Sequence, residues 1–145
     1  MIRVFLDANI LIDITDSNRK TSKVSAEFIK IMFDDMDTYK LYTSCDLITT
    51  IYYVSRKELG RIEALQQIKT MSKFITIIEF GNKEVDEAIE LMERNEKYID
   101  LEDTIQYVMA RKEKCDYIIT NDKTFASGDV PVLSSEEALR KFIQG

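Results

Sequence analysis

The fold is decided by the stretch DLEDTIQYVMARKEKCDYIITNDKTF, residues Asp100–Phe125. Apolar residues at helical spacing predict a helix over Asp100–Glu113. The short apolar run Tyr117–Thr120 predicts a buried strand, and Asn121 and Asp122 come directly after it. A helix that leads straight into a buried strand is typical of α/β proteins with a parallel sheet.

The same alternation of strands and helices continues on both sides of this stretch. Further strands are expected at Ile2–Leu6, Leu41–Thr43, Phe74–Phe80 and Val130–Leu133. Further helices are expected at Asp7–Thr15, Thr21–Asp35, Ser44–Leu59, Asn82–Asn95 and Ser135–Ile143, with a shorter one around Leu65. Gly60 stands where a helix C-cap is expected. The pattern predicts an α/β sandwich with a mostly parallel central sheet, in which ligands bind outside the carboxyl ends of the strands.

The composition limits the kind of chemistry that the chain can perform. The chain has 145 residues, a length that favours one compact domain over residues 1–145. It contains no histidine, and Cys45 and Cys115 lie far apart, which excludes His-based triads and His or Cys/His zinc sites. No apolar stretch has the length of a signal peptide core or a membrane span, so we expect a cytoplasmic protein without membrane contact.

The net charge and its distribution point to different partners. The formal net charge is −6, which at first argues against a general nucleic-acid binder because phosphates attract basic surfaces. The excess is concentrated in Glu79–Asp103, where ten acidic residues stand against three basic ones. Arg56–Lys73 instead holds five basic residues against two acidic ones. That segment is either a basic helical face that meets phosphates or an ordinary solvated helix surface.

Acidic and amide side chains stand at the predicted strand ends. Asp7 and Asn9 follow the first strand, Asp122 follows the Tyr117–Thr120 strand, and Asp103 lies at the start of the helix before it. If these points share one edge of the sheet, three aspartates converge and raise one another's proton affinity. Mg²⁺ or Mn²⁺ would hold them ionised, because these ions prefer oxygen ligands, and would activate water for attack on a phosphoryl group.

Each of these residues also has a purely structural interpretation. Asp7 and Asn9 are suited to cap the following helix. Asp100 and Asp103 have the spacing of a capping box, with Asp in place of the usual Glu or Gln, and Asn121–Asp122 is a common turn dipeptide. Taken singly, each structural interpretation is the more common one. Taken together at the ends of predicted strands, the residues favour a functional site.

Three segments in order along the chain resemble the signatures of the PIN-domain ribonucleases. VFLDANILID (Val4–Asp13) resembles the opening signature, YTSCDLITTIYYVSRKEL (Tyr42–Leu59) the strand–Ser–helix segment, and Asp100–Phe125 the C-terminal signature. The resemblance spans nearly the whole chain. It implies a three-layer α/β/α sandwich and a metal-dependent endoribonuclease that cleaves RNA phosphodiesters with a metal-activated water.

The resemblance also implies roles for individual residues. Asp7 and Asp103 would be the first and second metal ligands, Asp122 would hold the third acidic position of the metal site, and Asn9 would orient Asp7. The implied cofactor is Mg²⁺ or Mn²⁺, and the implied substrate is RNA. Many family members of this size resemble toxins of toxin–antitoxin pairs, and homodimers are common. The protein partners implied here are therefore a small antitoxin and a second copy of the chain.

One position departs from the family pattern. The central helix of the family commonly carries a Glu where this chain has Thr50, and a hydroxyl is a poorer Mg²⁺ ligand than a carboxylate. The chain resembles a subgroup with Thr or Asn at this place, so Thr50 is counted among the site residues. Asp46, one helical turn earlier, or Asp100 could partly compensate. The departure leaves open an alternative, a PIN-fold protein that binds RNA or acts as a scaffold without cutting.

A second alternative is aspartate-based phosphoryl chemistry of another class. A phosphatase of the haloacid-dehalogenase type would need Asp-x-Asp after the first strand, and Asn9 takes the second of these places. A receiver domain would need an Asp pair before the phosphorylated Asp and a Lys at a later strand end, and neither arrangement is evident.

Overall fold

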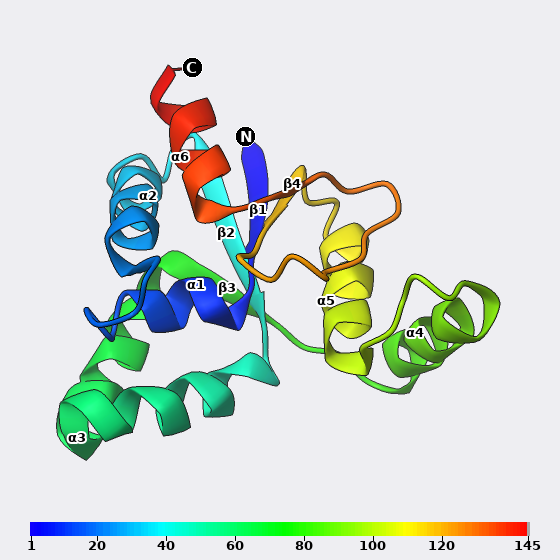
Figure 1. Ribbon diagram of the computed structural model, residues 1–145, viewed down its shortest axis with the longest axis horizontal. Coiled ribbons are helices and arrows are strands. Elements are labelled where there is room, and N and C mark those ends of the chain that lie inside the picture. The colour runs from blue at the N-terminus through cyan, green and yellow to red at the C-terminus, as the bar shows by residue number, and fades with distance from the viewer. Residues whose placement is uncertain (145) are drawn as a thin grey trace.

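In the computed structural model, the described residues are 1–144, and they form five strands and six helices (Figure 1). The strands are β1 (Ile2–Leu6), β2 (Tyr39–Ser44), β3 (Ile75–Ile78), β4 (Tyr117–Ile119) and β5 (Val132–Leu133). The helices are α1 (Ala8–Asp13), α2 (Ser22–Asp34), α3 (Leu47–Phe74), α4 (Asn82–Arg94), α5 (Leu101–Lys112) and α6 (Ser135–Gln144). Gly145, the last residue of the predicted domain, lies outside the described part.

The strands form one sheet in the order β3-β2-β1-β4-β5, and every neighbouring pair is parallel. The chain moves from β1 outward to β2 and β3, and then crosses back to add β4 and β5 on the other side of β1. The order of the strands therefore reverses between β1 and β4. Clefts at such a reversal, outside the carboxyl ends of the strands, are the usual binding sites of open α/β sheets.

Helices cover both faces of the sheet, which confirms the predicted three-layer α/β/α sandwich (Figure 1). Side chains of β1 alternate between two apolar cores because successive residues of a strand point to opposite faces. Val4 and Leu6 pack in the core formed with α1, α2, α3 and α6. Phe5 packs in the core on the opposite face, with α4 and α5. All three side chains are fully buried, which explains why β1 has no polar alternation.

The predicted elements are present, with shifts at their ends. The predicted strand Phe74–Phe80 is shorter in the structure, because only Ile75–Ile78 pair with β2. Phe74 instead ends α3, which continues through Gly60 as two helical parts joined at a bend. None of the helices within residues 1–144 is both long and apolar enough to cross a membrane.

Candidate active site

The carboxyl ends of β1 and β4 lie side by side, because the two strands pair in parallel with Leu6 opposite Ile119. Asp7 follows β1 directly, and Asp122 comes three residues after the end of β4. Asp103 belongs to the first turn of α5. The carboxylates of Asp7 and Asp122 both act on the proton affinity of Asp103. The structure therefore brings the three aspartates picked out in the sequence to one edge of the sheet.

Asp7 is held in place from three sides. Its side chain is only 5% exposed, and its Oδ1 accepts a hydrogen bond from the backbone N–H of Ala8 at 2.7 Å. Its Oδ2 accepts from Asn9 Nδ2 at 2.9 Å and from Thr120 Oγ1 at 2.8 Å. Donors from α1 and from the end of β4 therefore fix the orientation of this carboxylate, and each of them favours its ionised form.

Asn9, in α1, connects the start of that helix to the loop after β4. Its Nδ2 lies 3.0 Å from Thr120 Oγ1, in addition to the bond that it donates to Asp7. Its Oδ1 accepts from the backbone N–H of Asn121 at 3.1 Å. Asn9 thus contacts Asp7 in the way expected of a residue that orients it.

A second hydrogen-bond network joins Asn121 to Ser135 and Asp13. Asn121 donates to Ser135 Oγ at 3.1 Å and to Asp13 Oδ2 at 3.4 Å. Asp13 is fully buried and accepts from Arg19 Nε at 2.6 Å and from Ser25 Oγ at 2.5 Å. A buried carboxylate is stable only when it is paired and hydrogen-bonded in this way. The network joins α1, α2 and α6 to the loop that carries Asp122.

The structural roles of the acidic residues are also confirmed. Asp7 is the N-cap of α1, and Asp100 is the N-cap of α5, accepting from the backbone N–H of Asp103 at 2.9 Å. Asp122 forms a turn, because its Oδ1 accepts from the backbone N–H of Thr124 at 2.9 Å. Capping and turn formation therefore coexist with the gathering of carboxylates at the edge of the sheet.

Asp103 shows the electrostatic character of the site most clearly. Burial, together with the charges of Asp7, Asp100 and Asp122, raises its pKa to about 7. The charged groups that act on it are all carboxylates. Near neutral pH, Asp103 is therefore poised between its protonated and ionised forms.

The other two aspartates respond differently to the same surroundings. Burial raises the pKa of Asp7, while the hydrogen bonds from Thr120 and Ala8 offset part of that effect. Asp122 is more open to solvent, and the hydrogen bonds from Thr124 lower its pKa below the usual value. Asp122 therefore stays ionised near neutral pH and contributes a full negative charge to the cluster.

The structure adds Glu102 to the acidic cluster, a residue that the sequence did not single out. Burial raises its pKa, and the charges of Asp46, Asp7 and Asp100 raise it as well. The charge of Asp46, just before α3, therefore acts on this part of the cluster, while its compensation for Thr50 stays a prediction. Thr50 itself is exposed, and within residues 1–144 no hydrogen bond connects it to the three aspartates. Its role in the site stays a prediction.

The donor atoms of the site suit a hard divalent cation, although the side chains do not form a complete coordination sphere. The donors are oxygens alone, and the mutual repulsion of the carboxylates is what such an ion relieves. Among residues 1–144, however, no three acidic side chains are gathered closely enough to form a complete set of metal ligands. Mg²⁺ usually takes one or two protein carboxylates and keeps several waters, so this arrangement suits it.

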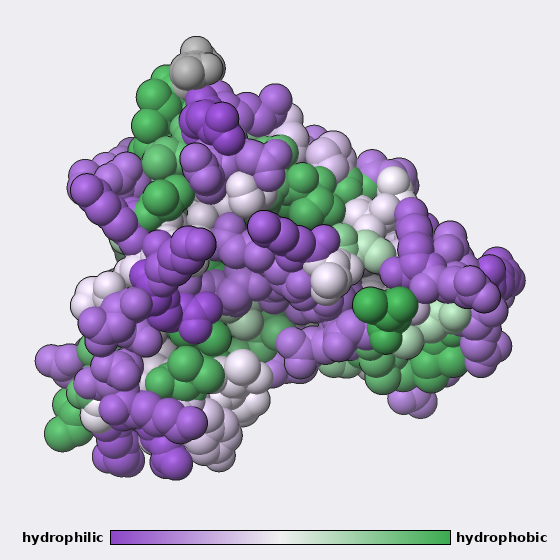
Figure 2. All heavy atoms as spheres, in the orientation of Figure 1, coloured by the Kyte–Doolittle hydropathy of each residue, from purple (hydrophilic) through white to green (hydrophobic). Residues whose placement is uncertain are grey.

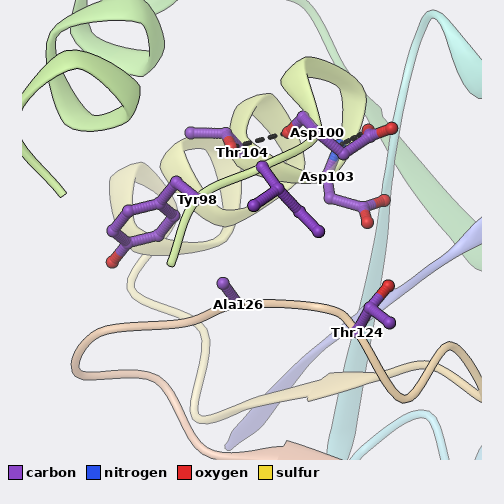
Figure 3. A pocket seen from close by; sticks show the side chains of 7 residues that line it. Tyr98, Asp100, Asp103, Thr104, Thr124 and Ala126 are labelled. Atoms are coloured by element: carbon purple, nitrogen blue, oxygen red, sulfur yellow. Dashed lines mark hydrogen bonds between the residues drawn. The ribbon is translucent and has the colours of Figure 1, made fainter. Parts of the chain in front are cut away.

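A small pocket opens beside Asp103. The side chains that line it come from the start of α5 and the loop after β4, and Asp103 and Thr124 point toward each other across it (Figure 3): Tyr98, Ile99, Asp100, Asp103, Thr104, Thr124 and Ala126. Tyr98 is buried, whereas Ile99 is 69% exposed. In Figure 2, the middle of the face in view is largely hydrophilic, with small hydrophobic patches. Asp103 therefore lies between the carboxylates and a wall that is partly apolar.

Comparison with known proteins agrees with this geometry. The family model of the PIN domain matches residues 4–130. The chain is 47% identical over 135 residues to Ribonuclease VapC1 of Aquifex aeolicus (strain VF5), covering 93% of this chain and 92% of that protein.

Two solved structures resemble the fold at low sequence identity. VapBC2 from Rickettsia felis, bound to a DNA fragment from its promoter, superposes with a TM-score of 0.69 at 14% identity, covering 92% of this chain and 98% of that one. VapC20 of Mycobacterium tuberculosis, described as a toxin that cleaves the sarcin–ricin loop, gives a TM-score of 0.61 at 11% identity, covering 79% and 86%. These likenesses establish the fold.

Proposed function

The chain belongs to the PIN-domain family, and on this premise we propose that it is a metal-dependent endoribonuclease that acts as the toxin of a toxin–antitoxin pair. The observation that carries the proposal is the cluster of Asp7, Asp103 and Asp122 at the edge between β1 and β4, where the carboxylates repel one another and form no ion pair with a basic side chain of the described residues. The high identity to a protein named as a ribonuclease supports the same activity.

Asp7 and Asp103 are the residues proposed to hold Mg²⁺ or Mn²⁺, with Asp122 next to them. A divalent ion bound there would supply an activated water and offset the charge that builds on the phosphate. Asp7 is already oriented by Asn9 and Thr120, so little rearrangement of that side chain is needed. Asp103 is the group whose protonation changes near neutral pH, and it must lose its proton to serve as a ligand.

The RNA is proposed to approach along the first part of α3. Arg56 lies over the rings of Tyr52 and Tyr53, 5.9 and 5.1 Å from the ring centroids. Tyr53 is 55% exposed, so its ring is free to stack on a base while Arg56 meets a phosphate. This helix begins next to Asp46, whose charge acts on Glu102 of the acidic cluster. Nucleic acid bound there would lead into the site.

A small antitoxin is the proposed protein partner. One structural neighbour is described as a toxin–antitoxin complex from Klebsiella pneumoniae, with a TM-score of 0.62 at 19% identity, covering 92% of this chain and 98% of that one. The proposed antitoxin would block access of RNA to Asp103 and Asp122. A homodimer is proposed on the family resemblance alone.

The proposal is tested by incubating labelled RNA with the protein in the presence and absence of Mn²⁺. We expect cleavage only with Mn²⁺, and a loss of more than about 100-fold in rate for Asp7→Asn. Asp37→Asn is the matched control, because Asp37 is exposed in the turn before β2, at the opposite edge of the sheet. It should cleave like the wild type.

Two results would contradict the proposal. Cleavage that survives Asp7→Asn, or that needs no metal ion, would overturn the mechanism. Tight RNA binding by a wild-type protein that never cuts would favour the alternative of a non-cleaving RNA-binding protein, which Thr50 in the usual place of a Glu suggests.

A further inference from the structure

Gln106 is a polar residue in an otherwise apolar part of α5. It lies three residues after Asp103, which puts the two side chains on neighbouring positions of one helix face. Its side chain is fully buried, as are those of Val108, Met109 and Ala110 that follow it. Neither RNA nor bulk solvent can reach it, so any role must act through a neighbouring group.

The amide of Gln106 lacks the partners that a buried amide normally has. Neither its Nε2 nor its Oε1 forms a hydrogen bond within residues 1–144. Buried side-chain amides are nearly always hydrogen-bonded, because an unpaired donor or acceptor in the interior costs stability. The folded protein would be more stable with an apolar residue of the same size at this position. Positions that break a packing rule in this way are commonly functional.

The neighbour of this amide is Asp7. The Gln106 side chain acts on that carboxylate and lowers its pKa, so the amide is near Asp7 although neither of its polar atoms forms a full hydrogen bond in the described residues. The full hydrogen bonds to Asp7 come from Ala8, Asn9 and Thr120, on α1 and at the end of β4. Within residues 1–144, none of the hydrogen bonds to Asp7 comes from α5, the helix that carries Asp103.

We propose that Gln106 is a positioning residue that donates its amide to Asp7 and thereby sets the place of α5, and so of Asp103, relative to Asp7 when a divalent ion is bound. The inference rests on the proposed metal-dependent function. It assigns the unpaired amide a partner, and it explains why a polar side chain occupies this buried place next to two proposed ligands.

The test compares Gln106→Met with the wild type by titration calorimetry with Mn²⁺, by the kinetics of RNA cleavage and by thermal unfolding without metal. Methionine keeps the length of the side chain and removes its donor and acceptor. We expect Mn²⁺ affinity to fall about 10- to 100-fold, the size of effect seen when a residue that orients a metal ligand is lost. The kcat for cleavage should fall with little change in KM, and the melting temperature without metal should stay the same or rise.

Tyr42→Phe is the matched control. The Tyr42 hydroxyl is also buried without a hydrogen-bond partner in the described part of the chain, and the ring packs in the same core as α5. Removing this hydroxyl should leave Mn²⁺ affinity within about twofold of the wild type, because a buried polar atom without a role in the site changes no ligand.

Each other outcome has a definite meaning. Mn²⁺ affinity unchanged in Gln106→Met, while the wild type binds and cleaves, would overturn this inference alone. A wild type that binds no Mn²⁺ would overturn the proposed function itself. If Gln106→Met does not fold, Gln106→Leu replaces it, and failure of both to fold would show that the amide serves the fold and would also overturn the inference.

Discussion

At the scale of single residues, the acidic side chains of the site do two things at once. Asp7 caps α1 and Asp100 caps α5, while both add negative charge around Asp103. A capping carboxylate is held by backbone N–H groups at a fixed place. The helix ends therefore supply positioned charge without further supporting residues, and the local interpretations of these residues in the sequence do not compete with the functional one.

The raised pKa of Asp103 predicts a pH dependence of stability in the metal-free protein. Its pKa of about 7 in the folded state lies above the ordinary value of 3.8, so the folded state holds the proton more tightly. The unfolded state then ionises first, and the free energy of unfolding falls as pH rises from about 4 to about 7. Asp103→Asn removes this contribution. The free energy of unfolding of Asp103→Asn minus that of the wild type should therefore increase across that pH range and level off above it.

Urea unfolding in the presence of a chelator, at a series of pH values from 4.5 to 8.5 (roughly the range in which such a group titrates), measures this difference. Asp37→Asn is the control, because it removes an exposed carboxylate far from the cluster. Curves for Asp103→Asn and the wild type that run parallel over the whole pH range would refute the prediction.

The place of several candidate site residues in the fold could be predicted from sequence, and that of two could not. Asp7, Asp103 and Asp122 stand beside predicted strand ends, so the topology of a parallel sheet is enough to gather them. Glu102 has no such signal, since one more acid at a helix start is typical of an ordinary first turn. Gln106 has none either, because its proposed role rests on complete burial without hydrogen-bond partners among the described residues, and burial depends on the packing of α5 against the sheet.

At the scale of elements, the bend of α3 at Gly60 is set by one backbone conformation. Gly60 has φ 82° and ψ 167°, a region that is essentially open to glycine alone. The two helical parts, residues 47–59 and 61–74, therefore meet at an angle, and Figure 1 shows α3 turning back on itself. Glycine after an apolar helical pattern was enough to predict this break. The end of β3 was not predictable from the pattern, because pairing with β2 stops at Ile78 although Phe80, two residues later, has high β propensity.

Gly60→Ala should lower the free energy of unfolding by about 1–3 kcal/mol, the usual cost of an L-residue in such a conformation. The cost is purely one of the backbone, since no atom of the described residues lies within 4 Å of an added Cβ. Chemical denaturation measures it. Gly81→Ser is the control, because Gly81 has an extended φ of −147° and equally open surroundings. Equal stability of Gly60→Ala and the wild type would disprove the role of this bend.

At the scale of the whole molecule, opposite charges are divided between regions of the fold. The acidic segment from residue 79 to 103 forms α4 and the start of α5, whereas the basic segment from residue 56 to 73 lies in α3. Electrostatic steering depends on such local fields rather than on net charge. A net charge of −6 is therefore compatible with a nucleic-acid partner that enters along α3.

This division predicts how RNA binding responds to salt. Replacing Arg56 and Lys57 together by Gln should weaken RNA binding several-fold. The slope of log affinity against log salt concentration should become shallower by about 0.7 for each phosphate that the protein no longer neutralises. Fluorescence anisotropy with labelled RNA in a chelator, where cleavage is absent, measures both quantities. Lys30→Gln on α2 is the control, since Lys30 is exposed and pairs with Asp34. An unchanged salt slope in the double variant would place the RNA elsewhere.

The position of β1 in the middle of the sheet has a consequence for the synthesis of the protein. Asp7 leaves the ribosome early, yet its hydrogen-bond partner Thr120 is 113 residues further along the chain. Asp122 follows later still. The carboxylate cluster cannot close until the chain has been translated past Asp122. On the proposed function, a nascent chain that has not yet reached Asp122 would lack part of the metal site and would leave the transcript from which it is being made uncut.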